Sequence, residues 1–244
     1  MTNHVALITG GAKGIGRGIA LDLAARQWRI AFCYRTSEAE AQATARDITT
    51  RGGQALGIRC DVSDPGAAKA LVAQVEKEWG HIDVLINGAG PYHRINLFDE
   101  TVEGWNEMFA GNLHPIFYLV QAAAPGMKAR KTGRIINFSM ANADQMEAQP
   151  DVTGHYIAKT GVLILTRTLA KLLAPYGITV NAISPGFIDS GSAPPQELAA
   201  MTKRIPAGYI GTIEDTLAAI RYLLSEEARY VNGANIQISG AWGI

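Results

Sequence analysis

The sequence predicts an α/β protein with a Rossmann-type, doubly wound parallel sheet of about seven strands, arranged as a three-layer sandwich. Two observations carry this prediction. Short β-branched runs alternate along the whole chain with longer segments whose apolar residues have helical spacing. A glycine-rich turn separates the first such run from the first helical segment. Strand–helix–strand alternation implies parallel strands with right-handed crossovers, so helices should cover both faces of one sheet.

The expected strands share a short, apolar and β-branched composition. They are Val5–Thr9, Arg29–Tyr34, Gln54–Cys60, Ile82–Ile86, Arg134–Phe138, Thr179–Ile183 and Asn235–Ile238. The expected helices between them are Ile15–Gln27, Glu38–Arg51, Pro65–Trp79, Val102–Met127, His155–Leu173 and Glu214–Leu224. Asp64 before Pro65 is a helix-start signal for the third of these helices. Because no repeat, low-complexity tract or linker interrupts the alternation, we expect a single domain over residues 1–244.

The composition excludes several classes of function. Lysine plus arginine and aspartate plus glutamate both number 22, so no basic field is expected to attract nucleic acid or an anionic membrane. No apolar run approaches the ~20 residues of a membrane span, and no signal-peptide pattern precedes Val5, so we expect a cytoplasmic protein. Cys33 and Cys60 stand in strand-like runs with no further ligands nearby, which favours buried free thiols and no metal site.

The glycine-rich turn runs from Thr9 to Gly16 and reads Thr-Gly-Gly-Ala-Lys-Gly-Ile-Gly. Glycines at this place allow a tight turn and a close approach of the backbone to a pyrophosphate. The N-terminus of the following helix then offers free N–H groups to the anion. Glycines also end strands for structural reasons alone, but the strand-to-helix context is the one that this mechanism requires. The turn predicts a dinucleotide cofactor bound by Gly10, Lys13, Gly14, Ile15 and Gly16.

The end of the second strand predicts which dinucleotide binds. An NAD enzyme places an acidic residue about 20 residues past the turn, on the ribose 2′-hydroxyl. Here the strand continues into Arg35, Thr36 and Ser37, with no acidic residue until Glu38. Arg35 can pair with a 2′-phosphate, to which Thr36 and Ser37 can donate hydrogen bonds, and Lys13 adds a second cation. These two cations can also be solvated surface charges, but their two positions favour NADP(H).

Further motifs accompany the Gly-x-x-x-Gly-x-Gly spacing of the turn. Asp61-Val62 follows the third strand, Asn87-Gly88-Ala89-Gly90 follows the fourth, and Trp105 precedes Asn112 by seven residues. Together the motifs resemble the short-chain dehydrogenase/reductase family over the whole chain. The segment Ile205–Gly240 is similar to bacterial 3-oxoacyl-(acyl-carrier-protein) reductases. The resemblance implies cofactor contacts at Asp61, Val62, Asn87, Gly88, Ala89 and Gly90, and nicotinamide contacts at Pro185, Gly186 and Ile188.

The catalytic pattern of the family is only partly kept. The family reduces carbonyls with a tyrosine, a lysine four residues later, a serine and an asparagine. The resemblance implies that Lys159 and Asn112 are the lysine and the asparagine. The tyrosine position holds His155, with Tyr156 one residue later, and the serine position holds Met140, directly after Ser139. A thioether cannot donate a proton to a carbonyl oxygen.

Three interpretations of this altered pattern stay open. Tyr156 can serve as the acid, with Ser139 as the serine, because residues three and four positions before Lys159 can both face it on a helix. His155 can be the acid, since its reference pKa of ~6.5 suits proton donation near neutral pH, although Lys159 would lower that pKa. Alternatively the site is inactive, and the chain is an NADPH-binding regulatory or structural partner.

The first interpretation of function is an NADPH-dependent oxidoreductase that transfers hydride to a carbonyl, or a related C=N bond, of a small-molecule substrate. His93 and Arg94 follow the fourth strand on the side where family substrates enter. The segment Ser190–Pro195 is expected to be a mobile lid. The resemblance also implies a homotetramer or a homodimer, formed through the helices Val102–Met127 and His155–Leu173.

Overall fold

The computed structural model describes residues 4–191 and 195–243. Its main sheet has seven strands in the order β3-β2-β1-β4-β5-β6-β9, and every neighbouring pair is parallel. The strands are β1 (Val5–Thr9), β2 (Arg29–Tyr34), β3 (Gln54–Arg59), β4 (Val84–Asn87), β5 (Gly133–Phe138), β6 (Ile178–Pro185) and β9 (Asn235–Ile238). The predicted doubly wound sheet is therefore confirmed, with boundaries that shift by up to two residues.

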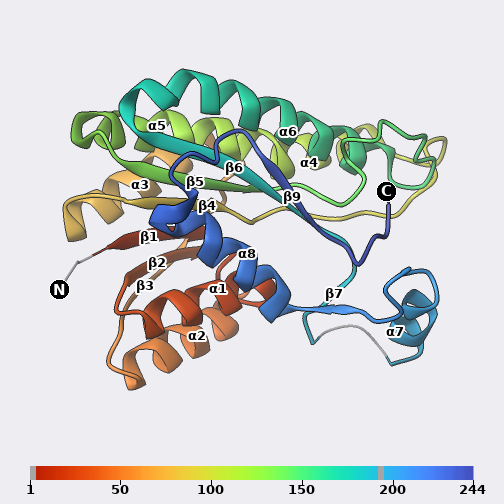
Figure 1. The fold of residues 1–244 in the computed structure, drawn as a ribbon, viewed down its shortest axis with the longest axis horizontal. Helices are drawn as coiled ribbons and strands as arrows, with labels where there is room; N and C mark the ends of the chain where they lie inside the picture. Colours follow the sequence, from red (N-terminus) through yellow and green to blue (C-terminus); the bar gives the residue numbers. More distant parts are fainter. Residues whose placement is uncertain (1–3, 192–194, 244) are drawn as a thin grey trace.

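Helices cover both faces of the sheet (Figure 1). One face carries α1 (Gly14–Ala25), α2 (Glu38–Thr50) and α8 (Ile213–Leu224). The other carries α3 (Pro65–Trp79), α4 (Val102–Asn112), α5 (His114–Arg130) and α6 (Thr153–Leu173). The predicted three-layer sandwich is thus the observed one.

The first strand shows why the core divides into two layers. All five residues of β1 are buried, as expected for a central parallel strand covered on both faces. Val5 and Leu7 pack in the cluster under α3 and α5, whereas Ala6 and Ile8 pack in the cluster under α1 and α8. Successive side chains of a strand point to opposite faces, so a continuous apolar run supplies both layers.

The segment Val102–Met127 is two helices and not the one helix that its periodicity predicts. The break lies at Leu113, between α4 and α5. The Asn112 side chain donates a 3.0 Å hydrogen bond to the carbonyl of Met108, one turn earlier, and so competes with the backbone for that acceptor. Pro115 has no N–H to donate to the carbonyl of Gly111. These local effects end the first helix without changing the apolar pattern.

The start of α3 follows its signal, since the Asp64 carboxylate accepts a 2.6 Å hydrogen bond from the N–H of Ala67. Smaller elements were not expected: two-residue strands β7 (Ile188–Asp189) and β8 (Gly211–Thr212), helix α7 (Pro195–Thr202), and 3₁₀ turns at Ala174–Tyr176 and Glu226–Ala228. Two-residue strands are too short to show periodicity. Of the expected lid, residues 192–194 lie outside the described residues.

In the described ranges, no helix combines the length and the apolar character needed to cross a bilayer. Both cysteines are free thiols, and burial raises the pKa of Cys33 to about 12.

Candidate functional site

A cleft of about 400 Å³ lies at the carboxyl edge of the sheet. Its walls are the turn after β1, the ends of β2, β3 and β4, and one face of α4. Strand β1 stands between β2 and β4, so the chain reverses its winding direction there, which is where open α/β sheets bind ligands. The cleft brings together most of the predicted cofactor residues: Gly10, Lys13, Ile15, Gly16, Arg35, Thr36, Ser37, Asp61, Val62, Gly88, Ala89 and Gly90.

The turn after β1 has the shape that a pyrophosphate requires. A Cβ atom at Gly16 would stand 2.2 Å from the carbonyl oxygen of Gly10, so only glycine allows this close fold of the turn. Gly14 has a φ of +55°, in the left-handed region. Lys13 precedes α1 without capping it through its side chain, which leaves the N–H groups of the first turn available to an anion. The residues present therefore fit a dinucleotide.

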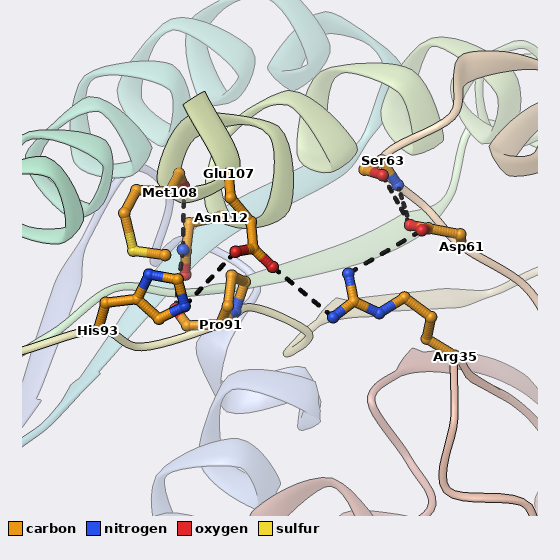
Figure 2. Close-up of polar contacts among 8 residues, drawn as sticks. All are labelled: Arg35, Asp61, Ser63, Pro91, His93, Glu107, Met108 and Asn112. Atoms are coloured by element: carbon orange, nitrogen blue, oxygen red, sulfur yellow. Dashed lines mark hydrogen bonds and ion pairs between the residues drawn. The ribbon is translucent and has the colours of Figure 1, made fainter. Parts of the chain in front are cut away.

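A chain of interacting polar side chains crosses the mouth of this cleft (Figure 2). The Arg35 guanidinium lies 4.0 Å from a carboxylate oxygen of Asp61 and 3.7 Å from one of Glu107. The other Glu107 oxygen lies 3.4 Å from Nε2 of His93. The Ser63 hydroxyl lowers the pKa of Asp61 most, through a 2.7 Å hydrogen bond, and Arg35 contributes less.

Glu107 is a lining residue that the sequence motifs do not single out. It lies on α4, one turn before Gly111, which lines the same cleft. The helical spacing of the two positions was the signal that could have located it, since residues four apart share a face.

The ends of the central strands are joined by buried polar groups. The Thr9 hydroxyl accepts hydrogen bonds from the N–H groups of Gly88 (3.0 Å) and Ala89 (3.1 Å). The Asn87 amide donates a 2.8 Å bond to the side chain of Asn137. Asn87 is 4% exposed and does not line the cleft, so its observed role is to connect β4 to β5.

His155 and Lys159 lie one turn apart on α6, and both are buried. Burial and, to a smaller extent, the positive charge of Lys159 lower the pKa of His155 to about 4, although a hydrogen bond with the backbone of Pro91 acts in the opposite direction. The Nδ1 atom of His155 has no hydrogen-bond partner among the described residues. The ring meets Tyr92 edge-on, with centroids 5.1 Å apart. The imidazole is therefore neutral near pH 7.

The Lys159 ammonium donates a 2.9 Å hydrogen bond to the carbonyl of Phe138, at the end of β5. Burial lowers the pKa of Lys159 to about 8. The neighbouring Ser139 hydroxyl donates a 2.8 Å bond to the main-chain carbonyl of Lys159. The first of the three interpretations uses the Ser139 hydroxyl in place of the serine of the family, and this hydroxyl is hydrogen-bonded to the backbone of α6.

Tyr156 follows His155 on the helix and so points about 100° away from it. Its hydroxyl donates a 2.7 Å hydrogen bond to the carbonyl of Asn142 and accepts a 3.1 Å bond from the N–H of Glu147. The structure places this hydroxyl against the loop of residues 140–147, whereas His155 contacts Pro91 and Tyr92.

Asn112, at the end of α4, contacts the edge of the cleft. Its amide donates a 3.0 Å hydrogen bond to the carbonyl of Pro91, the residue whose backbone also interacts with His155. Pro91 itself lines the cleft. The Asn112 side-chain oxygen is buried without a hydrogen-bond partner in the described part of the chain. The Pro91 carbonyl is therefore where the dinucleotide cleft meets the group of His155 and Asn112.

The expected nicotinamide contacts follow β6 at the same edge of the sheet but do not line the 400 Å³ cleft. The carbonyl of Pro185 accepts a 2.9 Å bond from Ala141, and the N–H of Gly186 donates a 2.9 Å bond to Ile238. Ile188 pairs with Gly211 in the small β7–β8 sheet. These residues lie beyond the cleft, and Pro185 contacts the loop that follows Ser139.

Comparisons with known proteins agree over nearly the whole length. Residues 10–241 match the family model described as enoyl-(acyl carrier protein) reductase. The 3-oxoacyl-[acyl-carrier-protein] reductase of Staphylococcus aureus is 34% identical over 238 residues, which is 96% of each chain. A short-chain dehydrogenase/reductase from Serratia marcescens superimposes with a TM-score of 0.91 at 29% identity, covering 99% of this chain and 98% of that one. A blue fluorescent protein from a metagenomic library, solved in complex with NADPH, has a TM-score of 0.91 at 30% identity, with 99% and 98% coverage.

Proposed function

Because the chain belongs to the short-chain dehydrogenase/reductase family, a family of oxidoreductases, we propose that it is an NADPH-dependent reductase of a carbonyl or a related C=N bond. The observation that carries this proposal is the buried pair His155 and Lys159 on α6, of which His155 interacts with Pro91, a residue that lines the cleft. The substrate is a small molecule, and 3-oxoacyl thioesters are the first class to test, because the S. aureus relative is named for them.

The cofactor supplies the hydride when it is bound. The turn at Gly10–Gly16 and the first turn of α1 would hold its pyrophosphate, and Asp61 with Val62 its adenine. Arg35, Thr36, Ser37 and Lys13 would bind the 2′-phosphate that distinguishes NADPH from NADH. Pro185, Gly186 and Ile188 would contact the nicotinamide amide, with Asn87 and Gly14 as structural support. The metagenomic relative solved with NADPH supports this choice of cofactor.

Each hydride that reaches the substrate requires one proton to complete the product. We assign this proton to His155 and Lys159 together. A lysine with a pKa of about 8 is protonated at neutral pH and is a competent general acid. A neutral imidazole can give its N–H proton to the product oxygen or nitrogen while its other nitrogen takes a proton from Lys159. Two N–H bonds then break, one on the imidazole and one on Lys159. One new N–H bond forms on the imidazole and one O–H or N–H bond forms on the product, so that His155 and Lys159 both end neutral.

Two observations support His155 over Tyr156 as the group that meets the substrate. The Tyr156 hydroxyl already donates to Asn142 and accepts from Glu147. The His155 ring is also hydrogen-bonded to the main chain, but its partner Pro91 lines the cleft, whereas Asn142 and Glu147 do not. Asn112 acts in this proposal by fixing Pro91, and Ser139 by fixing the backbone of Lys159.

A second candidate function has its own support. Met140 stands at the serine position, and the Ser139 hydroxyl is committed to the carbonyl of Lys159. In this alternative the chain is an NADPH-binding protein with impaired carbonyl reduction that acts as a regulatory or structural partner. Such a protein would keep the cleft and lose the catalytic hydroxyl groups in this way.

We also propose that the chain forms a homotetramer or a homodimer through the helices α4, α5 and α6. These helices carry exposed apolar side chains, and a cavity of about 550 Å³ lies between α5 and α6. The exposed side chains are Val102, Phe117, Ile157, Ile164 and Leu172.

Light scattering tests this oligomer. Ile164→Glu should lose it, whereas Tyr230→Glu, at a fully exposed position off these helices, should leave it intact.

The test of the proposed function is NADPH oxidation by the purified protein against ketones, 3-oxoacyl thioesters, quinones and cyclic imines. Turnover of at least one class, lost in His155→Gln, is the expected result. If NADPH binds tightly but no class is turned over, the proposed activity is wrong and the cofactor-binding partner is the better description. If NADPH does not bind, both candidates fail.

A further inference from the structure

The ion pair of Arg35 with Glu107 joins the two walls of the dinucleotide cleft. Arg35 follows β2, on one side of β1, and Glu107 lies on α4, on the other side. Their charged atoms are 3.7 Å apart, so the arginine side chain reaches across the mouth of the cleft (Figure 2). Both residues line the cleft, where the proposed 2′-phosphate of the cofactor would bind.

Arg35 is therefore shared between two carboxylates, and the two differ in what else they bind. Asp61 lies 4.0 Å from Arg35 and already accepts two hydrogen bonds from Ser63. Glu107 lies closer to Arg35, and its other partner is His93, at 3.4 Å. Glu107 thus depends more on Arg35 for compensation of its charge than Asp61 does.

We propose that Glu107 is a specificity-determining residue that competes with the 2′-phosphate of NADPH for Arg35. The inference rests on the proposed NADPH site and goes beyond it. A phosphate that pairs with Arg35 has to displace the Glu107 carboxylate and then remains near a charge of the same sign. NADH carries no 2′-phosphate and leaves the Arg35–Glu107 pair in place. Glu107 therefore reduces the preference for NADPH without removing it.

His93 reduces the cost of this competition, because it gives the Glu107 carboxylate a second partner. When Arg35 turns to a phosphate, the carboxylate keeps its contact with His93 and is not left without a partner. His93 stands two residues after Pro91, whose carbonyl binds Asn112. Glu107 consequently connects the phosphate end of the cleft to the loop that borders the proposed active site.

The experiment compares Glu107→Gln with a matched control on the same helix, Glu103→Gln. Glu103 is exposed and makes no ion pair within residues 4–191 and 195–243. Dissociation constants for NADPH and NADH are measured by titration at low and at high salt. Glu107→Gln should bind NADPH about threefold more tightly than wild type, the range expected for loss of an exposed ion pair, with NADH affinity unchanged. High salt should shrink this gain because exposed charges are screened.

Two further variants show whether Glu107 acts through Arg35. In the Arg35→Gln background, the Glu107→Gln substitution should raise NADPH affinity by less than it does in the wild-type background, since the competition for Arg35 is gone and only the direct charge repulsion is left. Glu107→Asp keeps the charge and should lie closer to wild type than Glu107→Gln does.

The outcomes separate this inference from the proposed function. A wild-type protein that does not prefer NADPH to NADH overturns the proposed cofactor and the role of Glu107 with it. A wild-type protein that prefers NADPH, with Glu107→Gln equal to Glu103→Gln or weaker in NADPH binding, overturns only the role of Glu107. An equal gain for NADH and NADPH also overturns it, because the phosphate would then play no part.

Discussion

The hydroxyl of Tyr156 donates a 2.7 Å hydrogen bond to the main-chain oxygen of Asn142. The N–H of Glu147 donates to the same hydroxyl, so one side chain of α6 ties two points of the loop between β5 and α6. Asn142 and Met146 in this loop both have positive φ values, +61° and +55°. A loop with such backbone conformations needs fixed contacts to hold its path, and Tyr156 provides two of them.

The first prediction separates this supporting role from catalysis. Tyr156→Phe should lower the free energy of unfolding by about 1–3 kcal/mol, because one buried and one partly buried main-chain group lose their partner. Its kcat/KM should stay within about threefold of wild type, whereas His155→Gln should lose about 100-fold or more, the usual contribution of acid–base catalysis. Urea unfolding and steady-state kinetics on one confirmed substrate measure both quantities. A reversed order of the two kinetic losses would make Tyr156 the acid.

The second prediction concerns stability at low pH. The pKa of His155 is about 4 in the folded protein and ~6.5 in an unfolded chain. Between these values only the unfolded state takes up the proton, so stability is lost as the pH falls from 6.5 toward 4. When the pH is lowered from 7.5 to 4.5, wild type should lose about 2–3 kcal/mol more of its free energy of unfolding than His155→Gln does. Equal losses in urea titrations of the two proteins would mean that the histidine is not neutral in the fold.

The third prediction concerns the pH dependence of turnover. If Lys159 supplies the proton, kcat with saturating NADPH should fall as the pH rises through about 8, the pKa of this lysine in the fold. Lys159→Arg retains a positive charge but does not titrate in this range, so its residual activity should stay flat between pH 7 and about 9. A wild-type rate that rises across the same interval would exclude Lys159 as the proton source.

The fourth prediction tests Ser139 as a positioning residue. Ser139→Ala removes the 2.8 Å hydrogen bond to the carbonyl of Lys159 and should cost about 1 kcal/mol of stability. Because the hydroxyl does not face the substrate in our proposal, the ratio of kcat for the variant and for wild type should stay within about threefold across a series of substrates. Losses of a hundredfold with an unchanged unfolding midpoint would instead place Ser139 in contact with the reacting group.

Much of the fold was predictable because it follows from local pattern. The alternation of β-branched runs and helical spacing located all seven strands of the main sheet, and Asp64-Pro65 located the start of α3. The helix break at Leu113 was missed because Asn112 and Pro115 act through single hydrogen bonds that periodicity does not register. The strands β7 and β8 were missed because a pair of residues carries no repeat.

Most residues of the proposed cofactor site could also be predicted from the sequence. The glycine turn and Arg35 follow the carboxyl ends of neighbouring parallel strands, and such ends meet at one edge of a sheet. Glu107 was not identified, because its pairing with Arg35 joins segments about 70 residues apart and depends on how α4 packs beside the loop that follows β4.

The sequence by itself determined the parallel sheet, the dinucleotide turn and the substitution of His155 and Met140 into the catalytic pattern. Only the tertiary structure decided where the neighbours His155 and Tyr156 point. That choice depends on which buried polar group each side chain meets, Pro91 in one case and Asn142 in the other. Both partners stand in irregular loops, whose path is set by long-range packing and hydrogen bonding and leaves no periodic trace in the sequence.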